Sequence, residues 1–145
     1  MFRNALLLGS RLLFAALFVP SGFQALADIA GTTAYFAGLG LPLPSLASWG
    51  TGLFELVAGL SILVGFQTRI MALLLAAFCI AAGFIGHYGQ GADDATLAFL
   101  HQQMLMKDIA IAGGFLALAM AGAGTLSADG RSTVMRTSVH DSNQK

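Results

Sequence analysis

Four long apolar stretches dominate the pattern of hydrophobic and polar positions along the chain. They cover residues 5–27, 49–66, 70–88 and 104–122. About 20 helical residues cross a hydrocarbon layer of roughly 30 Å, so each stretch is long enough to span a membrane. The stretches are apolar around most of the helix circumference, as expected in lipid, and they lack the alternation of a membrane barrel. The pattern predicts an all-α integral membrane protein, a bundle of four transmembrane helices.

The segment between the first two stretches, residues 28–48, combines aromatic residues with helix breakers. Tyr35 and Phe36 precede a run rich in glycine and proline at residues 38–44. Amphipathic segments of this kind lie at the membrane interface, and the breakers end a helix. The sequence therefore predicts a short interfacial helix followed by an irregular turn.

The last segment, residues 127–145, is polar and has no hydrophobic periodicity. Such a composition does not bury enough apolar surface to offset the entropy of ordering. We therefore expect a disordered cytoplasmic tail, which leaves residues 1–126 as a single membrane domain.

Basic residues indicate the orientation, because the cytoplasmic flanks of membrane spans retain Lys and Arg. The connecting segments 28–48 and 89–103 contain neither. The side of the membrane that holds both termini carries six: Arg3, Arg11, Arg69, Arg131, Arg136 and Lys145. This distribution predicts that both termini lie in the cytoplasm.

A cleavable signal peptide is an alternative interpretation of the first stretch. A basic start, an apolar core at residues 12–19 and the small residues 25–27 before Asp28 resemble such a leader. Cleavage would leave three spans in the same orientation. Arg11 interrupts the apolar run and favours a retained helix, from whose first turn the side chain would snorkel to the interface.

Composition excludes several classes of protein. Hydrophobic residues make up 57% of the chain and charged residues only 10%, with a formal net charge of zero, so no basic face for nucleic acid exists. The single cysteine, Cys79, excludes an internal disulfide and a cysteine-built zinc site, and we expect it to be a small buried residue. His87, His101 and His140 form no HExxH or HxH pattern, so no metal site is indicated.

Polar residues inside the predicted spans gather near one level of the membrane. Each ionisable group there costs roughly 2.5 to 3.5 kcal/mol on insertion into the membrane, so its presence calls for a structural or functional explanation. The group comprises Gln24, Glu55, His87, Lys107 and Asp108, all toward the extracytoplasmic ends. We therefore expect these polar groups to converge at one depth in the bundle, although Lys107 and Asp108 are adjacent, point about 100° apart and cannot both face the same neighbour.

Stripes of small residues indicate which helix faces pack closely. Ala58, Gly59 and Ile62 share the face of Glu55, so Glu55 should point into the bundle. Gly113, Ala117 and Ala121 form a second ladder, for which we expect another close helix contact.

Two interpretations of the polar group remain open. In the first, Glu55 and Lys107 form a structural ion pair, with Gln24 and His87 as hydrogen-bonding links between helices. In the second, Gln24, Glu55, His87, Lys107 and Asp108 surround a headgroup such as that of a quinone. Glu55 and His87 are then the candidate catalytic residues, because both can exchange protons.

The chain also resembles the DoxX family in the order and spacing of several short motifs. They are RLL at 11–13, PSGFQ at 20–24, YFAGLGLP at 35–42, ELVAG at 55–59, QTR at 67–69 and KDIAIAGG at 107–114. The resemblance covers about residues 5–127 and implies a four-helix bacterial inner-membrane protein with an uncleaved first span. Family members often carry Lys where this chain has Gln24, and the resemblance supplies no proven catalytic residue.

The resemblance also implies a redox context. The family takes its name from a subunit of a thiosulfate:quinone oxidoreductase, and other members look like membrane partners of redox or stress-defence proteins. We therefore expect a DoxX-like subunit of a membrane oxidoreductase system, with quinone as cofactor and with the lipid bilayer and a redox subunit as partners. The alternative is a non-catalytic scaffold or assembly partner. A small transporter is disfavoured, because the spans show no inverted repeat with broken helices.

Overall fold

Five helices account for most of residues 1–131, the part of the chain that the computed structural model describes. They are α1 (Phe2–Ala27), α2 (Ile29–Gly38), α3 (Pro44–Val64), α4 (Thr68–His87) and α5 (Ala95–Ala121). All except α2 are long and apolar enough to cross a membrane. This confirms the predicted all-α bundle of four spans, and α2 is the predicted short helix between the first two.

The spanning helices extend beyond their apolar stretches, most of all at the beginning of α5. That helix starts at Ala95, nine residues before the predicted span. The Asp94 carboxylate caps it by accepting hydrogen bonds from the backbone amides of Thr96 and Leu97, at 2.7 and 3.1 Å. Similarly, α3 begins five residues early with Pro44 in its first turn, where a missing amide proton is harmless. Hydropathy located the membrane-embedded lengths but not these polar first turns.

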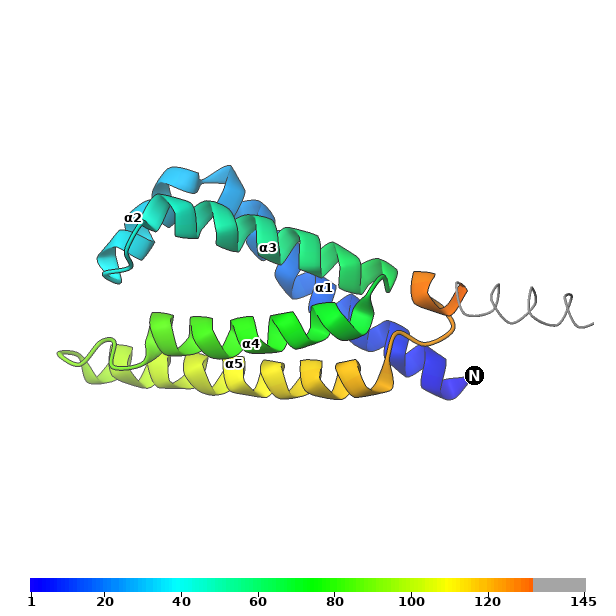
Figure 1. The fold of residues 1–145 in the computed structure, drawn as a ribbon. Helices are drawn as coiled ribbons and strands as arrows, with labels where there is room; N and C mark the ends of the chain where they lie inside the picture. The colour runs from blue at the N-terminus through cyan, green and yellow to red at the C-terminus, as the bar shows by residue number, and fades with distance from the viewer. Residues whose placement is uncertain (132–145) are drawn as a thin grey trace, which may run out of the picture.

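The four spanning helices pack as two pairs, α1 with α3 and α4 with α5, and contacts between the pairs are sparse. Figure 1 shows that the pairs approach each other at the end that holds the N-terminus and the α3–α4 turn. They diverge toward the opposite end, where α2 lies against α3 (Figure 1). The two pairs are therefore farthest apart at the α2 end of the bundle.

Glycine allows the backbones of α1 and α3 to touch. A Cβ atom on Gly22 would lie 2.5 Å from the Leu56 amide nitrogen and 2.8 Å from the Gly52 carbonyl oxygen. Further along, a Cβ on Gly59 would lie 3.1 Å from Val19. Close approach through small residues is the usual basis of helix association in lipid, where the hydrophobic effect does not drive it.

The two predicted small-residue stripes have different outcomes. Glu55 and its stripe of Ala58, Gly59 and Ile62 are all buried, so that prediction is confirmed. The ladder of Gly113, Ala117 and Ala121 is exposed, and a Cβ on Gly113 would meet nothing within 4 Å. The expected close contact was wrong, because α5 turns a different face inward, formed by Ala112, Phe115, Leu118 and Ala119.

An aromatic cluster fills the middle of the bundle and links the two helix pairs. Phe14 of α1 stacks on Phe115 of α5, with ring centroids 4.0 Å apart. Phe18 lies edge-on to Phe115 and to Phe78 of α4, and Phe54 of α3 packs at 5.1 Å from Phe78. Aromatic pairs in these geometries add attraction beyond the area that they bury. The cluster lies between the two ends of the bundle. We call the end with the N-terminus and the α3–α4 turn the joined end, and the end with α2 the divergent end (Figure 1).

Arg11 is the polar centre of the joined end. Its side chain is only 2% exposed, so it does not snorkel to the interface as expected. The guanidinium donates to Ile62 O and Leu63 O at the end of α3, at 3.0 and 2.7 Å. It also donates to Ala123 O and Leu126 O beyond α5, at 3.0 and 2.8 Å. The last carbonyls of a helix lack partners within the helix and carry partial negative charge, so a buried cation is stabilised here.

Asp129 secures the segment that follows α5. Its carboxylate accepts hydrogen bonds from the backbone amides of Gln67 and Thr68, both at 2.9 Å. Its own amide donates to Gly65 O at 2.9 Å. A carboxylate at a helix N-terminus satisfies free amides and interacts favourably with the helix dipole. The segment after α5 is thereby fixed to the turn that joins α3 and α4.

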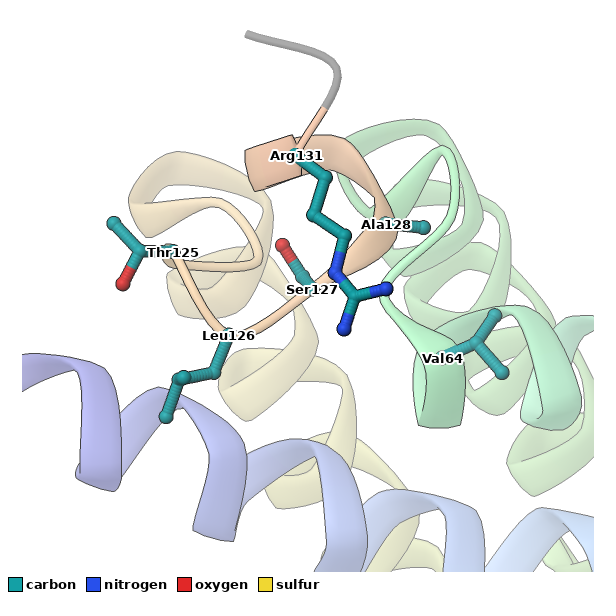
Figure 2. Close-up of a pocket in the computed structure, with 6 residues that line it drawn as sticks. All are labelled: Val64, Thr125, Leu126, Ser127, Ala128 and Arg131. Atoms are coloured by element: carbon teal, nitrogen blue, oxygen red, sulfur yellow. The ribbon is translucent and has the colours of Figure 1, made fainter. Parts of the chain in front are cut away.

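A short helical turn carries the chain to Arg131. Figure 2 shows the Arg131 side chain reaching over a pocket between Leu126 and Val64. Folded structure therefore continues a few residues past the expected boundary at residue 127. The rest of the predicted tail, residues 132–145, lies outside the described residues.

Candidate functional site

A cavity of about 500 Å³ occupies the divergent end of the bundle, between the two helix pairs. Residues from α1 to α5 contribute to its walls, and α2 with the turn after it lies along one side. The lining residues are Ser21, Tyr35, Phe36, Leu39, Leu41, Thr51, Glu55, Phe78, Ala81, Ala82, Ile85, Gly86, His87 and Asp108. Its walls are thus mainly apolar, with a small number of acidic and hydrogen-bonding groups, as is usual for small-molecule sites.

Three of the five predicted site residues meet in this cavity: Glu55, His87 and Asp108. Gln24 is exposed and lines a separate shallow hollow beside α2. Lys107 is also exposed and does not line the cavity. The five-residue pocket is therefore reduced to three of its members.

The expected ion pair between Glu55 and Lys107 is not formed, since the two side chains make no salt bridge. Glu55 is 9% exposed, and Ser21 of α1 lines the same cavity. Lys107 points away because Asp108, the next residue on α5, faces the cavity, and successive helical residues point about 100° apart. A structural ion pair therefore does not explain why Glu55 is buried.

His87 links the cavity to α5. Its Nε2 atom lies 3.8 Å from Asp108 Oδ2, and its Nδ1 atom lies 3.0 Å from His101 Nδ1. The His87 and Asp108 side chains are 19% and 28% exposed, so both are partly shielded from solvent. The three groups form a continuous polar chain at the end of the bundle where α4 and α5 are joined by their loop.

Tyr35 of α2 is a site residue that sequence reasoning missed. Its hydroxyl lies over Gly86 of α4, where an added Cβ would come within 3.3 Å of the oxygen. The tyrosine thus reaches across from α2 to the other helix pair. The aromatic residues of the interfacial segment were a signal, but the pattern does not indicate which of them turns inward.

His101 was missed for a different reason. The hydropathy pattern assigned residues 89–103 to a loop, whereas α5 begins at Ala95 and carries His101 on its second turn. Only the cap at Asp94 indicated the longer helix.

The single cysteine, Cys79, is buried as expected. Within residues 1–131, no three His, Cys, Asp or Glu side chains are arranged to hold a metal ion.

The fold and the cavity define a class: a helical membrane protein with four spans and a largely apolar cavity between two helix pairs, lined by a few acidic and hydrogen-bonding groups. Comparisons with known proteins then identify the family. A family model described as DoxX matches residues 6–88, and the chain belongs to the DoxX family. No solved structure matches it significantly.

Two relatives from Escherichia coli K12 match most of the chain. The inner membrane protein YphA is 35% identical over 131 residues, which are 89% of this chain and 91% of the relative. The inner membrane protein YqjF is 35% identical over 125 residues, or 83% and 86% of the two chains. The family match ends at residue 88 and so includes Tyr35, Glu55 and His87, whereas His101 and Asp108 lie beyond it.

Proposed function

We propose that this DoxX-family protein binds the headgroup of a membrane-soluble quinone in the cavity and acts as the membrane subunit of an oxidoreductase system. The observation that carries the proposal is the meeting of Glu55, His87 and Asp108 with Tyr35 in one largely apolar cavity. A volume of about 500 Å³ is within the usual range for small-molecule sites. Ionisable groups held at membrane depth are costly and are usually functional.

The lining groups suit the chemistry of a quinone. A quinone carbonyl accepts hydrogen bonds, and the Tyr35 hydroxyl and the His87 imidazole are potential donors. Reduction of a quinone to a quinol takes up two electrons and two protons. Glu55 and His87 can exchange these protons with a bound quinone. Proton transfer requires each group to lie within hydrogen-bonding reach of the reacting atom, and both residues line the cavity. The electrons come from a redox centre of a partner subunit.

The proposal includes an orientation, with the cavity on the extracytoplasmic side and both termini in the cytoplasm. Arg3 lies at the beginning of α1, Arg69 at the beginning of α4 and Arg131 after α5, and the Arg11 side chain donates to Ile62 O at the end of α3. These segments meet at the joined end of the bundle, opposite α2 (Figure 1). Lys and Arg are retained on the cytoplasmic side of membrane spans. The cavity would then accept a quinone headgroup from the outer leaflet.

Reporter fusions test this orientation. An alkaline phosphatase, which is active only in the periplasm, should be inactive when fused after Lys145 and active when inserted within residues 89–103. A cytoplasmic fluorescent reporter at the same two positions is the matched control and should give the opposite result. Phosphatase activity at Lys145 with none in the loop would place the cavity on the cytoplasmic side.

Filling the cavity should abolish quinone binding. Ala82→Leu places a larger side chain in the cavity wall, and we expect the affinity for decylubiquinone to fall at least tenfold. The measurement is equilibrium binding to the protein in lipid nanodiscs, corrected for partitioning into empty nanodiscs. Ala77→Leu is the matched control, because Ala77 is exposed on the same helix and lies outside the cavity.

Two results would contradict quinone binding: no saturable binding by the parent protein, or equal binding by the parent and Ala82→Leu. A scaffold function would replace it if, in addition, both proteins retained the same partner after purification from native membranes. The cavity would then be a by-product of helix packing.

A further inference from the structure

The His87 ring separates two hollows at the end of the bundle. On one side is the cavity described above. On the other is a crevice of about 420 Å³ beside the α4–α5 loop. Its lining residues are His87, Tyr88, Gly89, Gln90, Ala92, Ala98, Gln102, Leu105 and Met106. His87 is the only residue that lines both hollows in the described structure, so it lies between them.

The neighbours of His87 indicate which tautomer of each histidine fits the pair. The carboxylate of Asp108, whose Oδ2 lies 3.8 Å from His87 Nε2, is too distant for a hydrogen bond, but its negative charge favours a proton on that nitrogen. The Nδ1 atom of a neutral His87 is then an acceptor, and the Nδ1 atom of His101, at 3.0 Å, is its donor. The Nε2 atom of His101 is left as an acceptor. The two rings are therefore joined with a consistent direction, from His101 to His87.

We propose that His101 and His87 are a proton-transfer path between the aqueous end of α5 and the cavity, and that Asp108 positions the His87 ring. The proposal rests on the proposed function, because the protons serve a quinone in the cavity. It adds His101, which does not line the cavity, as the outer group of the path. Asp108 acts through His87 and is a positioning residue.

Each proton crosses in three steps that conserve charge. A proton from water binds His101 Nε2, and the proton on His101 Nδ1 moves to His87 Nδ1. The proton on His87 Nε2 then passes to the cavity, to a quinone oxygen or to the Glu55 carboxylate. One proton has entered and one has left, and both rings have changed tautomer. Rotation of the rings, or a proton moving outward when a quinol is oxidised, restores the starting state.

The groups around His87 support this direction of transfer. Tyr35 from α2 and Glu55 from α3 line the same cavity, so the inner side of His87 faces groups that can accept or hand on a proton. On α5, Asp108 has room beside α4 because of Gly83, where a Cβ would lie 3.0 Å from Asp108 Cβ and 3.1 Å from Oδ2. The absence of a side chain at Gly83 thus lets the carboxylate approach His87.

A purely structural role for the histidine pair makes a different prediction. If the pair only holds α4 to α5, a glutamine at position 101 should serve as well, because its amide also donates a hydrogen bond to His87 Nδ1. An amide cannot pass a proton onward. His101→Gln therefore separates a hydrogen bond between helices from a proton path.

The first experiment tests the linked pair without any quinone. Solid-state NMR of the protein in lipid bilayers, with ¹⁵N-labelled histidine, should show a coupling across the hydrogen bond between the Nδ1 atoms of His87 and His101. His101→Gln should remove this signal. His140→Gln is the control, because it also removes one histidine but should leave the signal intact. A parent protein without the coupling would overturn the path.

The second experiment measures proton delivery. Decylubiquinone bound to the protein in nanodiscs is reduced anaerobically by the methyl viologen radical cation, a strong one-electron donor that releases no proton, so that two electrons from it and two protons from water give the quinol. A pH indicator and the quinone absorbance follow the reaction. His101→Gln should bind the quinone within twofold of the parent but take up protons at least tenfold more slowly. Gln103→Asn, an exposed change on the same helix, should behave like the parent.

The outcomes separate the two proposals. Equal proton uptake by His101→Gln and the parent, with quinone bound to both, overturns the proton path and leaves the proposed function intact. A parent that binds no quinone overturns the proposed function, and with it the purpose of the path.

Discussion

Arg11→Met should lower the free energy of unfolding by about 3 kcal/mol or more, because the substitution removes one charged donor from four carbonyl groups. A hydrogen bond to a charged group contributes roughly 1.5 to 3 kcal/mol, and a buried carbonyl left without a donor costs a similar amount. Water admitted to the site would recover part of the loss. The measurement is reversible unfolding in mixed micelles, followed by circular dichroism.

Two further variants give this prediction its controls. Arg11→Lys keeps the charge, but its compact ammonium lacks the planar fork that reaches carbonyls of both α3 and the segment after α5, so we expect an intermediate loss. Arg3→Met removes an exposed arginine from the same end of the protein and should change stability by about 0.5 kcal/mol at most. Equal losses for Arg11→Met and Arg3→Met would show that the buried network contributes little.

Gly22→Ala should lower the free energy of unfolding by about 2 to 3 kcal/mol, although it adds a single methyl group. Overpacking costs roughly 1 to 3 kcal/mol, and here the nearest atoms belong to the backbone of α3, at Leu56 and Gly52. Backbone atoms cannot rotate away as a side chain does, so α1 and α3 must separate. The loss should appear in the same unfolding measurement.

Gly113→Ala is the matched control for this substitution. Its added Cβ meets no atom within 4 Å, and alanine favours a helix over glycine by up to about 1 kcal/mol. We therefore expect unchanged or slightly increased stability. If Gly22→Ala were as harmless as Gly113→Ala, close contact between the α1 and α3 backbones would not determine how this pair associates.

The contacts at the joined end and in the middle of the bundle also explain where the cavity lies. Arg11 holds α1 to the end of α3 and to the segment after α5, and Asp129 holds that segment to the beginning of α4. The aromatic cluster around Phe78 and Phe115 closes the middle of the bundle. Beyond it the helix pairs diverge, and polar groups line the remaining space. The stability of the joined end thus allows the opposite end to stay open.

The number of membrane spans followed from the sequence alone. Lipid offers no partners to backbone amides and carbonyls, so an apolar stretch of sufficient length must become a helix whatever its neighbours are. An even number of spans also placed the two ends of the membrane domain on one side. The burial of Glu55 was predictable too, because the small residues Ala58 and Gly59 share its helix face.

Which residues line the cavity was decided by the tertiary structure. Position along a helix fixes the depth of a residue in the membrane, and on depth alone Gln24 and Lys107 belonged with Glu55. Each step of one residue turns a side chain by about 100°, however, so Asp108 faces the cavity while Lys107 does not. Gln24 lies almost one turn beyond Ser21 and lines the separate hollow beside α2.

Arg11 and His101 show the same limit of a sequence pattern. An arginine within an apolar run is compatible with snorkelling to the interface or with burial, and only the carbonyls brought near it by α3 and the segment after α5 favour burial. His101 entered the site because Asp94 begins α5 nine residues before its apolar part. The sequence determined which segments cross the membrane, because lipid imposes that choice on each segment separately. The tertiary structure decided how each helix is rotated about its axis, because rotation depends on contacts between segments that are distant in the chain.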